Sequence, residues 1–154
     1  MMHLFNKMSP FCIRRSICAF MVLMFSMLWQ VTAMADIAVI ANPASAIGSI
    51  DAATVKRIYL GKLKSWPDGS SLTVVDSSAG TAMRQQFLKQ VVGKKEIKFD
   101  SYWSRKAFSG KGTPPKNLGS DADIKAYIAA NVGSIGYINA AQVDATVKVL
   151  MKIK

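Results

Sequence analysis

The sequence predicts an α/β protein in which helices cover a central, partly parallel sheet. Short apolar runs bounded by turn residues alternate along the chain with segments whose apolar residues recur at helical spacing. The chain has 154 residues, 51% of them hydrophobic, which excludes a disordered or low-complexity protein and suits one domain. No internal repeat or block of like charge divides it.

The first two expected elements are a buried strand and a helix. Ile37–Ile40 is a short apolar run that ends at Asn42 and Pro43, as a buried strand followed by a turn does. Ser49 can then cap a helix through Leu60, and Gly61 follows where that helix would stop.

A second strand and helix follow a tight turn. Trp66–Gly69 has turn chemistry, and Leu72–Asp76 has the β-branched character of a strand. The small residues of Ser77–Thr81 then open into a helix to about Val92, which Gly93 ends.

The C-terminal half repeats this alternation. Asp100–Phe108 predicts an aromatic helix, whereas the glycines and prolines of Ser109–Pro115 predict a loop. Ser120 and Asp123 resemble a capping box at the start of a helix through Ala130. The last two expected strands are Ile135–Ile138 and Val147–Ile153.

Residues 1–35 have the pattern of a secretory signal peptide. Arg14 and Arg15 precede a mostly apolar stretch over Ile17–Trp29, and Ala33 and Ala35 place small residues before a cleavage site. The apolar stretch is shorter than the roughly 17–25 residues that span a bilayer, which argues against a membrane anchor. We therefore expect cleavage after Ala35, export to the periplasm and a mature domain over 36–154.

Removal of residues 1–35 reduces the kinds of chemistry that the mature chain can carry out. The remaining 119 residues carry 17 basic and 9 acidic side chains, a net charge of +8. They contain no cysteine and no histidine, which excludes disulfides, thiolate nucleophiles, zinc–thiolate sites and a Ser-His-Asp triad. No spaced carboxylate pair suggests acid–base catalysis, and Asp76 has the position of a turn or cap residue. We expect no enzyme activity, catalytic residue, metal site or cofactor.

The segment that follows the second strand is the candidate anion site. A helix start offers unpaired N–H groups and partial positive charge, and small residues let an anion approach them. Ser77, Ser78 and Thr81 supply hydroxyls, Gly80 allows close approach, and Arg84 could add a bidentate contact. The alternative is that Ser78 only caps the helix.

The excess of lysine and arginine over aspartate and glutamate indicates a solvated, basic surface. The lysines and arginines are scattered over loops and helix ends, without the interleaved aromatic residues of a nucleic-acid groove. Together with export, this argues against nucleic acid as a partner.

Five short motifs occur in one order over residues 37–140. They are Ile58–Lys62, Trp66–Gly69, Ser78–Thr81, Gly110–Gly112 and Gly133–Tyr137. As a set they resemble the phosphate-binding proteins of ABC importers, members of the type 2 periplasmic binding protein superfamily. The resemblance implies a single lobe of that fold, mainly the second, with a mixed sheet flanked by helices.

The resemblance also implies phosphate contacts from the segment around Thr81, with two departures. Gly80 and Thr81 match the family, but its arginine falls on Val75 and its serine on Ala79. The family normally closes two lobes around the anion, and this chain covers about one.

Two functions follow from these observations. The first is a periplasmic protein linked to phosphate ABC transport that binds inorganic phosphate or a related oxyanion through Ser77, Ser78, Gly80, Thr81 and Arg84. Such binding would be weak, or would need a second lobe from another chain. The alternative is a non-catalytic periplasmic interaction module that has kept the fold, has lost the ligand and binds a membrane or envelope protein.

Overall fold

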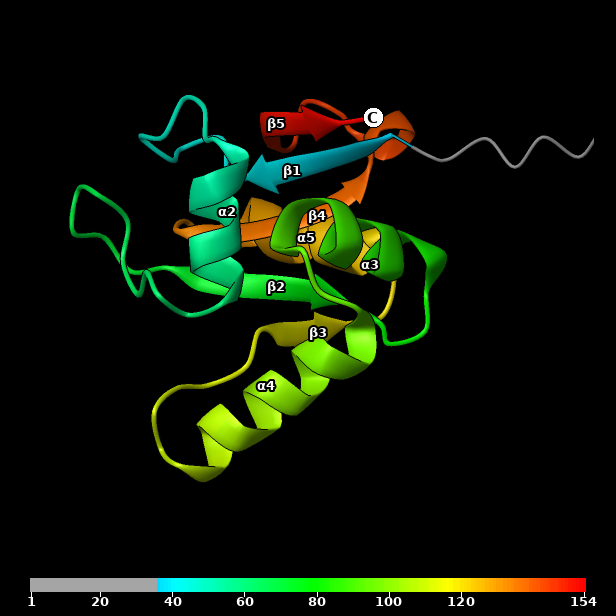
Figure 1. Cartoon of the computed structure of the whole chain (residues 1–154). Coiled ribbons are helices and arrows are strands. Elements are labelled where there is room, and N and C mark those ends of the chain that lie inside the picture. Colours follow the sequence, from blue (N-terminus) through cyan, green and yellow to red (C-terminus); the bar gives the residue numbers. More distant parts are fainter. Residues whose placement is uncertain (1–35) are drawn as a thin grey trace, which may run out of the picture. The chain divides into compact units, whose positions relative to one another are not determined.

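A computed structural model describes residues 36–154, which contain a five-stranded sheet in the order β3-β2-β4-β1-β5 (Figure 1). The expected signal peptide lies outside the described residues. β2 runs parallel to β3 and β4, whereas β1 is antiparallel to β4 and β5, so the expected mixed sheet is confirmed. The strands are β1 Ile37–Ala41, β2 Thr73–Ser77, β3 Lys116–Leu118, β4 Ser134–Asn139 and β5 Lys148–Ile153.

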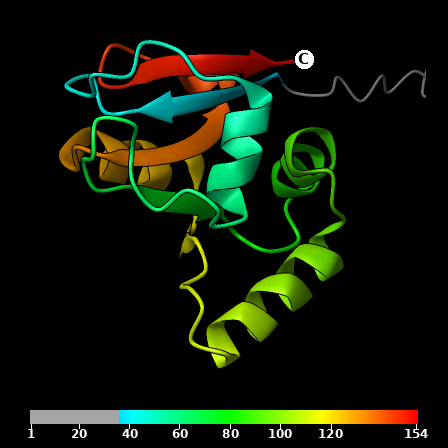
Figure 2. The ribbon, with the colours of Figure 1, turned by 60° about the vertical axis from the view of Figure 1, so that its left-hand side comes forward.

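Helices cover both faces of the sheet (Figures 1 and 2). α2, α3, the π-helical turn η1 and α4 contribute to the larger apolar cluster, and α5 packs on the opposite face. The helices are α2 Ala52–Tyr59, α3 Ala82–Phe87, η1 Leu88–Val92, α4 Glu96–Phe108, α5 Asp121–Ala130 and the 3-10 turn η2 Ala140–Gln142.

The burial of β1 on both faces explains why this strand contains no polar residue. All five of its side chains are fully buried, because Ile37, Val39 and Ala41 pack into one cluster while Ala38 and Ile40 pack into the other. A strand buried on both faces is expected to read as a continuous apolar run.

Several boundaries differ from the expected ones. The N-cap of α2 is Asp51, in an extended conformation, rather than Ser49, because the Ile50 N–H donates to the Leu150 carbonyl (3.4 Å) instead of joining the helix. α4 begins at Glu96, four residues before the expected Asp100. The expected helix to Val92 becomes π-helical from Leu88 onward.

The C-terminal half follows the expectation more closely. Ser120 and Asp123 form the capping box at the start of α5, with the Asp123 backbone N–H donating to Ser120 Oγ (3.2 Å). β3 was not expected, since it has only three residues after two prolines.

Gly133 fixes the turn before β4, because its carbonyl accepts hydrogen bonds from two other segments. Its φ is +86°, in the left-handed region that favours glycine. Its carbonyl accepts hydrogen bonds from the Trp66 indole (3.0 Å) and the Thr73 backbone N–H (3.1 Å). A Cβ at this position would lie 2.3 Å from the Ser71 carbonyl oxygen.

Gly133→Ala should therefore lower the free energy of unfolding by about 3 kcal/mol, because backbone strain of about 1 kcal/mol adds to a collision with main chain. Gly69→Ala is the matched control: Gly69 has φ +82°, but a Cβ there would meet nothing within 4 Å. That variant should lose only about 1 kcal/mol. Urea unfolding measures both, and equal losses would contradict the collision with Ser71.

Candidate functional site

The five residues predicted to bind an anion lie on one continuous segment at the end of β2. Ser77 is the last residue of β2, and Gly80 turns the chain with φ +80°. Thr81 is the N-cap of α3, and its Oγ1 accepts the Arg84 backbone N–H (3.3 Å). The structure thus places the candidate residues at a helix start, as the sequence indicates.

The hydroxyl groups of this segment bind main-chain atoms. Thr81 Oγ1 donates to the Ser78 carbonyl (2.9 Å) and lies 3.3 Å from Ser77 Oγ. Ser78 Oγ donates to the Gly119 carbonyl (3.0 Å), so Ser78 ties the segment to the loop before α5 and is not the helix cap. These hydroxyls fix the conformation of the turn.

Arg84 is buried and forms ion pairs with three carboxylates. Its relative exposure is 4%; Nε lies 2.9 Å from Asp76 Oδ2, and one Nη lies 2.7 Å from Asp100 Oδ1. The other Nη binds Glu96 Oε1. Burial alone would lower the pKa of Arg84, but Asp100, Asp76 and Glu96 together raise it above its usual value. The guanidinium is therefore permanently charged, and its donors are directed at carboxylates.

Glu96, in the first turn of α4, also binds the amide that was expected to face an anion. Its Oε1 accepts the Gly80 backbone N–H (2.7 Å), and its Oε2 accepts the Gln85 side-chain amide (3.2 Å). The Gly80 hydrogen bond and Arg84 hold the pKa of Glu96 below its ordinary 4.5, although burial acts in the opposite direction. An internal carboxylate thus contacts both the amide and the guanidinium.

Asp76 is a buried partner rather than the turn residue that the sequence suggested. Its Oδ1 accepts the Tyr137 hydroxyl (2.6 Å) and the Ser77 backbone N–H (2.9 Å). Burial, and then the charge of Asp76, raise the pKa of Tyr137, so the phenol stays protonated and donates. The Tyr137 ring stacks on Phe87 at 3.9 Å between centroids.

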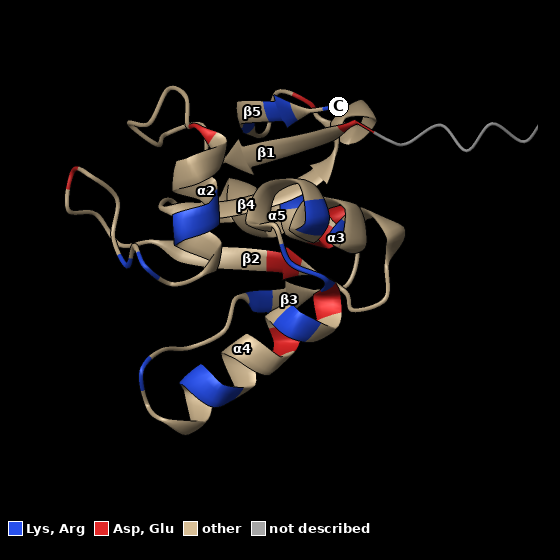
Figure 3. Ribbon diagram, viewed as in Figure 1, with Lys and Arg blue, Asp and Glu red and all other residues tan. Residues whose placement is uncertain are grey.

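The acidic residues outnumber the single cation at this place. Arg84 with Asp76, Glu96 and Asp100 carries a formal charge of −2 when all are ionised. Red segments of β2 and α4 lie close to α3 in Figure 3. The sequence did not single out Glu96 or Asp100; the one available signal was an aspartate closing an otherwise apolar strand.

Within residues 36–154 no helix is long and apolar enough to cross a membrane, and no three His, Cys, Asp or Glu side chains are grouped as metal ligands.

A family model described as the PBP superfamily domain matches residues 27–152. This chain belongs to the PBP superfamily. The resemblance noted from the sequence is therefore confirmed at the level of the family. No curated protein sequence matches the chain.

Solved structures of phosphate transport proteins share the fold. A putative phosphate ABC transporter substrate-binding protein from Clostridium perfringens, with bound phosphate, is 22% identical with a TM-score of 0.61; the match covers 75% of this chain and 45% of that one. An ABC-type phosphate transport receptor from Vibrio cholerae is 19% identical with a TM-score of 0.60, covering 76% and 46%. The chain spans less than half the length of these proteins and corresponds to a single lobe.

The Glu96 contacts predict how stability depends on pH. Because the pKa of Glu96 is lower in the folded chain, the unfolded chain binds more protons as the pH falls. The stability from these contacts is complete above the ordinary pKa of 4.5 and is lost as the pH drops through the folded value.

Glu96→Gln should therefore be less stable than the original chain at neutral pH, yet lose less stability between about pH 5 and pH 3. Urea unfolding across this range measures both curves. Parallel curves would show that Glu96 does not contribute to acid sensitivity.

Proposed function

We propose that this chain is an exported, non-catalytic interaction module of the phosphate-binding-protein type. It keeps the architecture of one lobe and closes the anion segment with its own carboxylate. The observation that carries this proposal is the Glu96 carboxylate, which accepts the Gly80 N–H and binds Arg84.

The negative charge around Gly80 and Arg84 supports the proposal that the anion segment is closed to phosphate. A phosphate near Gly80 would meet a cluster with a formal charge of −2 when all its groups are ionised, and this charge would repel the anion. The family's arginine and serine are replaced by Val75 and Ala79, so a cation and a hydroxyl are absent from the matching positions. The segment is better suited to holding β2, α3 and α4 together than to holding a free anion.

The extent of the match bears on the same proposal. The chain spans less than half of the solved phosphate transport proteins that it resembles. We propose that a membrane or envelope protein, or a second lobe from another chain, faces the anion segment.

Export and cellular location belong to this proposal. We infer a cleaved signal peptide over residues 1–35, a mature PBP-like domain over 36–154 and a periplasmic location. N-terminal sequencing of the protein recovered from the periplasm tests this inference, with Asp36 as the expected first residue.

Removal of Glu96 should uncover phosphate binding. Glu96→Ala frees the Gly80 N–H and one side of Arg84, so calorimetry should detect phosphate at about 10 mM or below, whereas the original chain should give no heat there. Asp100→Ala is the matched control, because it removes the same charge beside Arg84 and leaves the Gly80 N–H occupied.

The control variant should also give no heat. Submillimolar binding by the original chain would overturn the closed site and favour the second function below. If folded Glu96→Ala gives no heat with phosphate, Glu96 does not block the segment.

Two observations favour a second function. The Clostridium perfringens structure with bound phosphate shares this fold. Gly80 and Thr81 also agree with the family resemblance drawn from the sequence. We therefore also propose that inorganic phosphate or a similar oxyanion, in a process linked to phosphate ABC transport, binds at Ser77, Ser78, Gly80, Thr81 and Arg84. Binding here requires displacement of Glu96.

If this second function holds, Thr81→Ala should weaken phosphate binding by about tenfold, since one hydroxyl contact to an anion is lost. Sulfate and phosphate titrations followed by calorimetry measure the change. Thr146→Ala removes an exposed threonine in the loop before β5 and should leave the affinity unchanged. An unaltered affinity in Thr81→Ala would place the anion elsewhere.

A further inference from the structure

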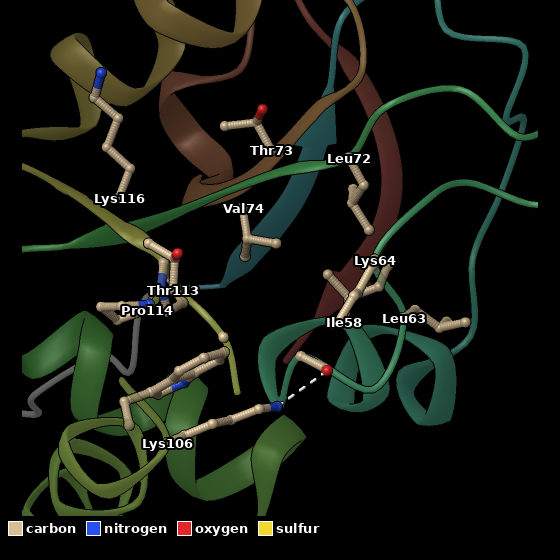
Figure 4. A pocket seen from close by; sticks show the side chains of 14 residues that line it. Ile58, Leu63, Lys64, Leu72, Thr73, Val74, Lys106, Thr113, Pro114 and Lys116 are labelled. Carbon is tan, nitrogen blue, oxygen red and sulfur yellow. Dashed lines mark hydrogen bonds between the residues drawn. The ribbon is translucent and has the colours of Figure 1, made fainter. Parts of the chain in front are cut away.

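A second hollow lies at the opposite end of β2 from Ser77. It has a volume of about 430 Å³ and is bounded by the last turns of α2 and α4, the first residues of β2 and the loop before β3 (Figure 4). Thr73 and Val74 begin β2, so the length of the strand separates this pocket from the Ser77–Thr81 segment.

The walls of the pocket are largely apolar. Ile58 of α2, Leu72 and Val74 face it together with Pro114 of the loop (Figure 4). The Trp103 indole closes another side, and its Nε1 donates to the Tyr59 carbonyl (3.1 Å), which fixes the ring. A hollow of this size with a mostly apolar lining suits a small organic molecule.

Lys106 places a positive charge against this apolar lining. Its Nζ donates to the carbonyls of Leu60 (2.8 Å) and Gly61 (3.0 Å) and lies 4.8 Å from the centre of the Trp103 ring. A Cβ at Gly61 would approach Lys106 Nζ to 2.8 Å, so the chain closes tightly on this ammonium. The charge is held in position at the pocket.

Lys64 and Lys116, the other lysines that line the pocket, lie differently. Lys116 extends to α5, where its Nζ lies 4.5 Å from the centre of the Tyr127 ring, whereas Lys64 is exposed at the pocket. None of the described residues that line the pocket is acidic. Lys64 and Lys106 therefore give the pocket a positive potential, and Thr73 and Thr113 add hydroxyl groups to its wall.

We propose that this pocket binds a small organic anion with an apolar body, such as a short-chain carboxylate. The apolar body would lie on Ile58, Val74 and Trp103, and the carboxylate would pair with the exposed Lys64. Lys106 would add its charge only, because its three N–H groups are directed at Leu60, Gly61 and Tyr102. The site does not depend on the state of Glu96 and is separate from the proposed function of the anion segment.

Two-dimensional NMR of the amide and indole N–H groups tests the proposal, with hexanoate as the probe and hexanol and inorganic phosphate as comparisons. Hexanoate at about 10 mM should shift the signals of Gly61, Gly112 and the Trp103 indole, and both comparisons should shift them far less. Lys64→Glu should weaken hexanoate binding by roughly fivefold, because it reverses a charge at the pocket.

Lys62→Glu is the matched control, since Lys62 is an exposed neighbour that does not line the pocket. It should bind hexanoate like the original chain. Equal shifts from hexanol or phosphate, equal weakening in both variants, or no shift from hexanoate would each overturn the proposal. If phosphate shifts only the amide signals of Ser77–Thr81, it acts at the anion segment, and the result for the pocket still stands.

Discussion

The ion pairs of Arg84 hold together three elements that follow one another in the chain. The guanidinium belongs to α3, while its partners come from β2 and α4. A buried cation that lost these partners would be left without compensation, which typically costs several kcal/mol. The position of α4 depends on the Glu96 and Asp100 contacts with Arg84 together with the packing of Phe99 and Trp103 in the larger apolar cluster.

The same cluster carries the proposal that this chain is an interaction module. Helix starts attract negative groups whether these belong to a ligand or to the protein itself. Here the carboxylate of Glu96 reaches Gly80 across sixteen residues of sequence. An internal carboxylate thus occupies an amide that the sequence suggested for an external anion.

Local signals predicted most of the fold, and long-range contacts account for what they missed. The apolar run of β1 and the capping box at Ser120 are encoded by adjacent residues, so both could be predicted. α4 starts earlier than expected because Glu96 is fixed by Arg84 and Gly80, which a reading of neighbouring residues does not reveal. For the same reason, the carboxylates around Arg84 were not anticipated, and anion binding by the five candidate residues stays a prediction.

The place of β1 in the sheet has a consequence for how the protein acquires its structure. Among the described residues, β1 lies between β4 and β5, the two strands farthest from it in the sequence. Such distant pairings slow folding relative to helical proteins of similar size. The centre of the sheet can therefore close only after the segments at both ends of the described range have met, so β1 is among the last strands to gain its full set of hydrogen bonds.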